Sequence, residues 1–218
     1  MSKERYLPQL VAQLENYSWR EWPALRGQTN DIRCGVLIPM QVSDDIMVYA
    51  GLRSGGLENH AGEICFPGGR PEKEDTGLEA TALREASEEM GISDVQILGR
   101  LSSMPLYTSN YRLEPFVGLI GNDVPVEDGS ELVAVLPVSM RELLGRPRIN
   151  ALAWDDNGSE ALSPVFELAN RLMFGATAYV LYELLTICAP VLSLKLPPME
   201  KGPYTWDDIV KSTKVSAE

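Results

Sequence analysis

The feature that most constrains this chain is a short apolar strand that leads through a glycine-rich turn and a polar loop into a helix bearing three carboxylates. The run reads ICFPGGRPEKEDTGLEATALREASEEMGI, from Ile64 to Ile92. Thr76 and Glu79 have the spacing of a capping box, and the residues after them favour helix. We therefore predict a helix from about Gly77 to Met90, ended by the glycine that follows it.

The three carboxylates lie along one edge of this predicted helix. At about 100° per residue, Glu85, Glu88 and Glu89 fall within one arc beside an apolar face. They repel one another and face the negative end of the helix dipole, a cost that Arg84 offsets in part. The pattern alone leaves two interpretations open, a solvated charged face or a site for a hard cation such as Mg²⁺.

The residues before the helix favour the cation site. Gly68 and Gly69 let backbone approach a phosphate or offer a carbonyl to a metal ion. Gly69, a loop acid and R-E-A-x-E-E-x-G-I in this order resemble the Nudix hydrolase box, which runs G, five residues, E, seven residues, R-E-U-x-E-E-x-G-U, with U aliphatic. In this chain the loop acid is Asp75, and eight residues separate it from Arg84.

An upstream signature narrows the resemblance to the branch that includes coenzyme A pyrophosphatases, which also carries the extra loop residue. That signature is R-S/A, three residues, R, three residues, G, three residues, F-P-G-G, and this chain reads RSGGLENHAGEICFPGG. Glu58 stands where the signature has its second arginine, so a charge is reversed where an anionic substrate is expected. Segments 107–120, 131–144 and 174–185 also resemble that branch, in the same order.

The resemblance implies an α/β fold, a Nudix-type α/β/α sandwich with a mixed β-sheet. It implies a metal-dependent hydrolase that cleaves the pyrophosphate bond of a nucleoside diphosphate-linked substrate, with coenzyme A or a derivative as the leading candidate. Two alternatives stay open: another substrate, such as ADP-ribose, a nucleotide sugar or a dinucleotide, or a Nudix-like module that binds a nucleotide without cleaving it.

Family positions also assign the site residues. The expected ligands of Mg²⁺ or Mn²⁺ are Gly69 through its carbonyl, Glu85, Glu88 and Glu89. The expected catalytic residues are Arg84, which orients the carboxylates, Glu88, and Glu131, with Glu131 or a box glutamate as the base. The expected substrate-binding residues are Arg53, Ser54 and Phe66.

The length, charge and cysteine content of the chain limit the domain size, binding partners and compartment that we expect. The chain has 218 residues, enough for one domain with additions, and its net charge of −12 gives no attraction to nucleic acid or to anionic membranes. Three cysteines without paired metal-site spacing indicate buried thiols in a reducing compartment. No signal peptide is visible, so we expect a cytoplasmic protein. The lone His60 is expected to form a hydrogen bond within its loop.

Apolar periodicity predicts the organisation of the chain. We expect residues 1–30 to be an amphipathic helix, over 5–17, and a lead-in, with the Nudix domain at 31–190 and a tail at 191–218. That helix would pack on the core or on a partner subunit in a homodimer. The predicted strands are 34–40, 46–52, 63–66, 95–101, 113–121 and 132–138. Residues 154–164 are predicted as a loop or short hairpin, and the apolar stretch 175–194 as a buried helix that ends before Pro190.

Overall fold

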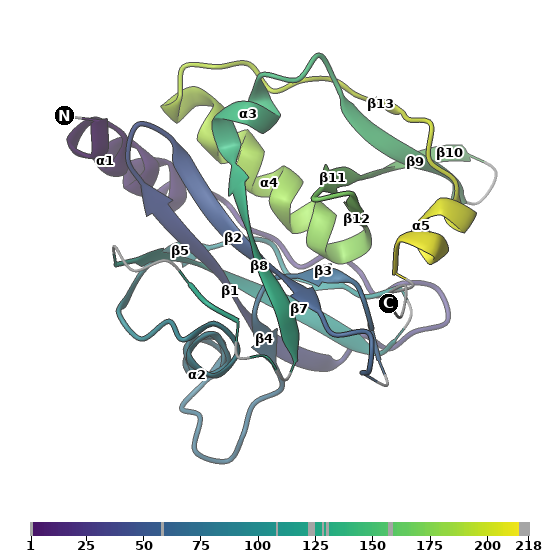
Figure 1. Cartoon of the computed structure of the whole chain (residues 1–218), viewed down its shortest axis with the longest axis horizontal. Coiled ribbons are helices and arrows are strands. Elements are labelled where there is room, and N and C mark those ends of the chain that lie inside the picture. The colour runs from purple at the N-terminus through teal and green to yellow at the C-terminus, as the bar shows by residue number, and fades with distance from the viewer. Residues whose placement is uncertain are drawn as a thin grey trace.

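A mixed β-sheet lies at the centre of the molecule, between helices on its two faces (Figure 1). The computed structural model describes residues 2–57, 59–107, 109–121, 125–127, 129, 131–156 and 159–213. Eight strands form this sheet: β1 (Ile32–Val42), β2 (Ile46–Arg53), β3 (Ile64–Cys65), β4 (Gly68–Gly69), β5 (Val95–Arg100), β6 (Met104–Pro105), β7 (Tyr111–Ile120) and β8 (Leu132–Ser139).

The sheet is mixed because one central pair is parallel. Strands β1 and β7 run side by side in parallel from Ile32 opposite Tyr111 to Met40 opposite Leu119. Strands β4 and β2 pair with β1 antiparallel, and β5 and β6 pair with β7 antiparallel. Strand β8 pairs with β2 on the other side, so Leu132 lies opposite Arg53.

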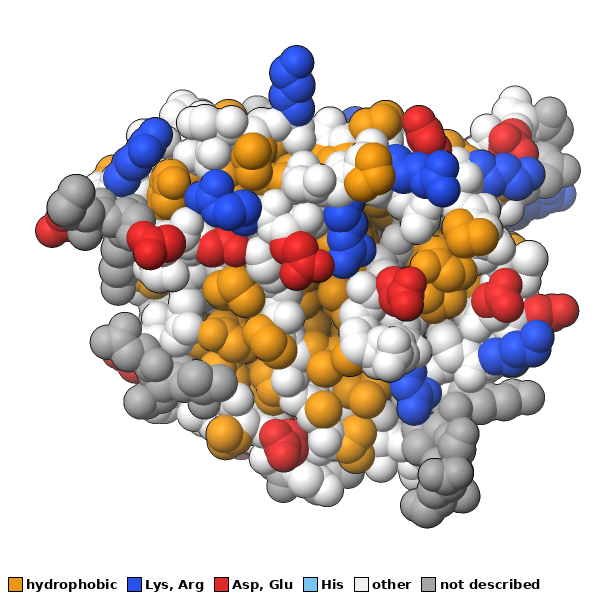
Figure 2. Space-filling view, turned by 45° about the horizontal axis from the view of Figure 1, so that its top comes forward, with side chains coloured by type: hydrophobic (Ala, Val, Ile, Leu, Met, Phe, Trp, Pro, Cys, Tyr) orange, Lys and Arg blue, Asp and Glu red, His pale blue; other side chains and the backbone are white. Residues whose placement is uncertain are grey.

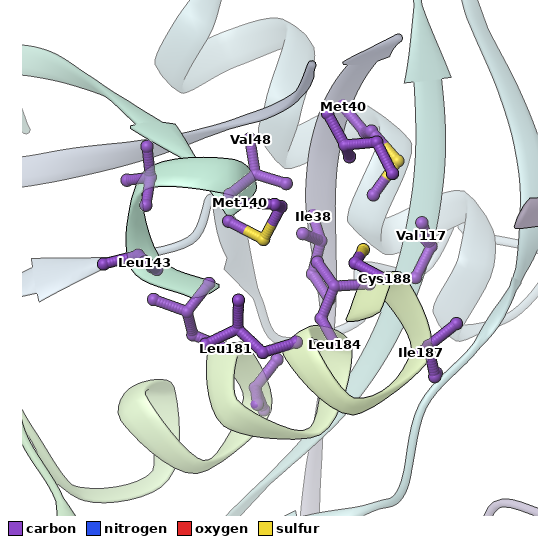
Figure 3. Packing of buried hydrophobic residues seen from close by; sticks show 14 of the residues in the cluster. Ile38, Met40, Val48, Val117, Met140, Leu143, Leu181, Leu184, Ile187 and Cys188 are labelled. Carbon is purple, nitrogen blue, oxygen red and sulfur yellow. The ribbon is translucent and has the colours of Figure 1, made fainter. Parts of the chain in front are cut away.

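Two apolar layers hold the helices on the sheet. On one face, α1 (Ser2–Glu15) and α4 (Gly175–Val191) pack with α3 (Met140–Leu144) over the larger core. Figure 3 shows this core at α3 and α4, where Met140, Leu143, Leu181 and Leu184 meet the sheet residue Ile38. On the other face, α2 (Leu78–Met90) packs over a smaller core. This arrangement confirms the predicted α/β/α sandwich with a mixed sheet.

A smaller set of elements adjoins the larger core. Strands β9 (Ile149–Asp156), β10 (Ser159–Pro164) and β13 (Met199–Lys201) form a second sheet, and β11 (Phe166–Leu168) pairs with β12 (Arg171–Met173). Helix α5 (Trp206–Thr213) packs on these elements through Ile209, which is 3% exposed. Figure 2 shows hydrophobic atoms gathered in the hollowed middle of one face, with charged side chains around them.

Most predicted elements are present. The six predicted strands correspond to β1, β2, β3, β5, β7 and β8, and the helix predicted over 5–17 is α1, which packs on the core. Of the predicted loop or hairpin at 154–164, the described residues 154–156 and 159–164 lie in the antiparallel strands β9 and β10. The three cysteines are free thiols, with Cys34 and Cys188 buried and Cys65 partly buried. Across the described residues, no helix is long and apolar enough to cross a membrane.

Two details of the predicted helices were wrong. Helix α2 has no capping box, because Gly77 is its N-cap and no side chain caps it. Its C-terminal glycine, Gly91, does adopt the left-handed conformation with φ of 64°. Helix α4 does not end before Pro190 but includes it. The flanking Ala189 and Val191 are buried in the core, and their packing outweighs the single backbone hydrogen bond that the exposed proline removes.

The contact between α2 and β1 depends on a missing side chain. A Cβ atom at Gly35 would lie 2.1 Å from the carbonyl oxygen of Leu78 and 3.0 Å from the amide nitrogen of Ala82. Both are helix backbone atoms, which cannot swing aside as a flexible side chain could. The glycine therefore sets how closely α2 can approach the sheet.

We predict that Gly35→Ala destabilises the fold by about 1–3 kcal/mol, the usual cost of overpacking. Urea unfolding would measure this loss. Gly121→Ala is the matched control, because a Cβ there would lie no closer than 3.5 Å to another atom. Equal stability of the two variants would contradict the assigned role of Gly35.

Candidate active site

The glycine turn and helix α2 meet at Glu85. Strand β4 places Gly69 opposite Gly35 of β1, and α2 crosses β1 at the same point. A Cβ atom on Gly69 would lie 2.1 Å from Oε1 of Glu85. Only glycine lets the turn lie this close to the carboxylate, so the predicted ligands Gly69 and Glu85 are neighbours.

Arg84 joins the loop to the acidic edge of α2. Its guanidinium donates to Asp75 Oδ2 at 3.2 Å, Glu85 Oε1 at 3.0 Å and Glu88 Oε2 at 2.9 Å. It also donates to the carbonyl of Arg70 at 3.1 Å. These hydrogen bonds hold the pKa of Asp75 below its usual value, and Asp75 also accepts from the Glu72 amide. Arg84 thus ties the loop acid to two box glutamates.

Glu89 is the most buried carboxylate of the cluster. It is 5% exposed, and its Oε2 is buried with no hydrogen-bond partner. Its Oε1 lies 4.0 Å from Nη1 of Arg53. Burial, with smaller contributions from the charges of Glu85 and Glu131, raises the pKa of Glu89 to about 8 despite this arginine.

The other two box glutamates are more accessible. The Glu85 side chain is 17% exposed, and burial raises its pKa although Arg84 acts in the opposite direction. The Glu88 side chain is 58% exposed and reaches Arg84 across one helical turn. Accessibility therefore increases from Glu89 through Glu85 to Glu88, so the cluster runs from the protein interior to solvent.

Glu131 lies beside the cluster although it is distant in sequence. Its carboxylate is 3.4 Å from Nη2 of Arg53, and its carbonyl accepts from the Ser54 amide at 2.7 Å. Its charge helps to raise the pKa of both Glu85 and Glu89. Pairing of β8 with β2 brings Glu131, Arg53 and Ser54 together.

The remaining predicted residues differ in their surroundings. Phe66 is 5% exposed and packs in the core on the α4 side, so packing alone accounts for it, and substrate contact stays a prediction. His60 lies 3.1 Å from Glu63 within its loop, as predicted, and this partner raises its pKa. Glu58 lies outside the described residues.

Two neighbours of the site were not predicted from the sequence. Asp75 was identified only as the loop acid of the box, but it is the main anchor of Arg84. Cys65 contacts Arg53, and burial raises the pKa of its thiol to about 12. The position of Cys65 one residue before Phe66 gave no signal of this contact, which arises because β3 pairs with β2.

The residues present fit a hard divalent cation, although Arg53 and Arg84 also lie beside the carboxylates. Among the described residues, no three histidine, cysteine or acidic side chains converge as one metal-binding group. Nevertheless the unpartnered Oε2 of Glu89 and the Glu85 carboxylate against the glycine turn are oxygen ligands one helical turn apart on α2. Carboxylate and carbonyl oxygens are the ligands that Mg²⁺ prefers.

We predict that protein stripped of metal with EDTA loses stability as the pH rises from about 5 to about 8.5. Because its pKa is raised, Glu89 keeps its proton in the folded protein over a pH range in which it ionises in the unfolded chain, where its pKa is 4.5. The contribution of Glu89 to the free energy of unfolding is therefore complete below pH 4.5 and is lost as the pH rises through about 8. Urea unfolding at several pH values should show less of this loss in Glu89→Gln. Glu79→Gln, at an exposed position of the same helix, should keep it; identical profiles for the two variants would contradict the assignment.

Comparisons with known proteins agree with this geometry. A family model for the NUDIX domain matches residues 36–155, more than half of the chain. Two relatives, each described as an uncharacterized Nudix hydrolase NudL, come from Yersinia pestis (strain Pestoides F) and Yersinia pseudotuberculosis serotype O:1b (strain IP 31758). Each is 34% identical over 156 residues, covering 70% of this chain and 77% of the relative.

A solved structure also resembles the fold. The crystal structure of a MutT/nudix family protein from Enterococcus faecalis aligns with a TM-score of 0.47 and 12% sequence identity, over 88% of this chain and 71% of its own. The residues matched by the family model include the glycine turn and helix α2. The chain therefore belongs to the Nudix hydrolase family, whose members act on pyrophosphate bonds.

Proposed function

We propose that this protein is a metal-dependent pyrophosphohydrolase that cleaves a nucleoside diphosphate-linked substrate, with coenzyme A or a derivative as the leading candidate. The observation that carries the proposal is the meeting of Gly69, Glu85 and Glu89 beside Arg53 and Glu131. A solvated charged face would leave its glutamates exposed, whereas Glu89 is buried at a cost that only a functional or packing role can offset.

In this proposal the metal ligands are Glu85, Glu89 and the carbonyl of Gly69, with Glu88 as a further ligand or a partner of metal-bound water. A divalent cation held by these residues would neutralise the pyrophosphate and would make water a better nucleophile near neutral pH. The protein supplies the positioning, because Arg84 is fixed by Asp75 and in turn holds Glu85 and Glu88. Without Arg84, the repulsion between their negative charges would separate the Glu85 and Glu88 carboxylates.

Arg53, Ser54 and Glu131 form the proposed substrate side of the site. The Arg53 guanidinium faces Glu89 and Glu131, so it can bind a phosphate oxygen at the edge of the carboxylate cluster. Glu131 is accessible, with 49% of its side chain exposed, and can accept a proton from attacking water. It is our first candidate for the general base, and a box glutamate is the second.

The upstream signature supports coenzyme A, and one residue of that signature argues for a less anionic substrate. Arg53, Ser54, Gly62 and the FPGG turn match the signature, whereas Glu58 replaces its second arginine. A carboxylate at this position would repel substrate phosphate. ADP-ribose, nucleotide sugars and dinucleotides are therefore the alternative substrates, and binding without cleavage is the remaining alternative.

We predict that hydrolysis requires a divalent cation and that Glu85→Gln or Glu89→Gln lowers kcat by roughly 10²-fold or more, the scale of losing one electrostatic stabiliser of the transition state. Screening wild type against coenzyme A, ADP-ribose, nucleotide sugars and dinucleotides, with Mg²⁺ and with Mn²⁺, identifies the substrate for these assays. Glu79→Gln is the control on the same helix. Wild-type rates after EDTA treatment, or in either variant, would refute the metal assignment.

The same assay tests the base. Glu131→Gln should lower kcat while substrate binding, measured separately, stays within about twofold of wild type. An unchanged rate would transfer this role to a box glutamate and leave the metal assignment intact.

We further predict that the protein hydrolyses coenzyme A with a high KM or prefers a less anionic diphosphate, and that Glu58→Arg improves coenzyme A hydrolysis chiefly through KM. A contact made equally in the ground and transition states acts on KM rather than on kcat. Because salt screens such charges, the gain should be larger at low than at high ionic strength. Equal kcat/KM values of wild type and variant at low salt would refute the electrostatic explanation.

A further inference from the structure

Helix α5 touches the segment that carries the proposed substrate-binding residues. A Cβ atom on Gly62 would lie 2.0 Å from the carbonyl oxygen of Thr213, the last residue of α5. Gly62 also has φ of +71°, in the left-handed region that favours glycine. Two independent constraints therefore require glycine here, one from the turn and one from the end of α5.

The residue after Gly62 links this contact with α5 to the backbone of Arg53. The carbonyl of Glu63, which follows Gly62, accepts from the Arg53 amide at 2.9 Å. Ser54, which follows Arg53 in the sequence, donates from its amide to the Glu131 carbonyl at 2.7 Å. A short path thus runs from Thr213 through Gly62 and Glu63 to the guanidinium that faces Glu89.

Helix α5 is also anchored to strand β12. Nη1 of Arg171, on β12, donates to the carbonyl of Ser212 at 2.6 Å. Ile209 is buried against the smaller core, and β12 also contacts β3. In Figure 1, α5 lies at the edge of the molecule beside β12, near the end of the described chain. These contacts let α5 act as a strut between the smaller elements and the segment around Gly62.

We propose that α5 is a positioning element for the substrate-binding segment. Its C-terminus packs against Gly62 and thereby holds Arg53 and Ser54 beside Glu131 and Glu89. The inference rests on the proposed function, because it gives α5 a role in binding the diphosphate substrate. The family model ends at residue 155, so it does not include this helix. Loosening the strut should weaken substrate binding and leave the chemical step, which depends on α2, nearly unchanged.

The test compares Gly62→Ala with Gly56→Ala in the full-length protein at saturating Mg²⁺ or Mn²⁺, with the best diphosphate substrate of the screen. Gly56 lies in the same segment, and a Cβ there would lie 3.8 Å from its nearest neighbour. We expect Gly62→Ala to raise KM roughly three- to tenfold, the scale of one lost hydrogen bond, with kcat within about twofold. Gly56→Ala should match wild type.

A second pair of variants loosens α5 without touching the glycine. Arg171→Met removes the donor to Ser212 and should also raise KM, whereas Arg171→Lys keeps a donor and should restore much of the wild-type value. Hydrogen exchange in substrate-free protein should be faster at 59–63 in both Gly62→Ala and Arg171→Met. If α5 had only a structural role, these variants would lower the melting temperature without changing KM.

The outcomes separate this inference from the proposed function. If wild type hydrolyses a diphosphate but Arg171→Met keeps its KM while α5 exchanges faster, the strut is refuted and the function stands. A fall in kcat at constant KM would also refute it. If wild type hydrolyses no diphosphate, the proposed function fails, and hydrogen exchange still decides the mechanical link: unchanged exchange at 59–63 in Arg171→Met would refute it.

Discussion

The close approach of helix α2 to strand β1 at Gly35 is the contact on which the rest of the site depends. It fixes the height of the helix above the sheet, and strand β4 fixes the glycine turn beside the same strand. Gly69 and Glu85 are therefore held against each other by backbone packing on both sides. Close-packed backbone has little freedom to relax, which gives the carboxylates a rigid base.

Charge balance then decides how the carboxylates are arranged. Arg84 is bound to Asp75 and cannot leave without exposing that partner, so it acts as a fixed counter-charge for Glu85 and Glu88. Among the described residues, the Arg53 guanidinium lies against Glu89, Glu131 and Cys65, and its Nε is buried without a hydrogen-bond partner. The two arginines thus differ in anchoring, which matches a structural role for Arg84 and a substrate-facing role for Arg53.

The smaller elements after β8 extend the fold in a way that bears on the site. Helix α4 covers the sheet on the face away from α2, and its buried side chains carry the helix through Pro190. Helix α5 reaches back to the segment around Gly62.

The sequence by itself determined six of the eight strands of the main sheet, the approximate extent of α2 and the membership of the box, because period-2 and helical patterns are local and the box residues are nearly contiguous. It indicated Glu131 only through family position. Tertiary structure decided what spacing cannot encode: the pairing of β8 with β2 that brings Glu131 to Arg53, the anchoring of Arg84 by Asp75, and the contact of Thr213 with Gly62. Each joins residues through packing of separate elements, and packing also overrode the local helix-ending signal at Pro190.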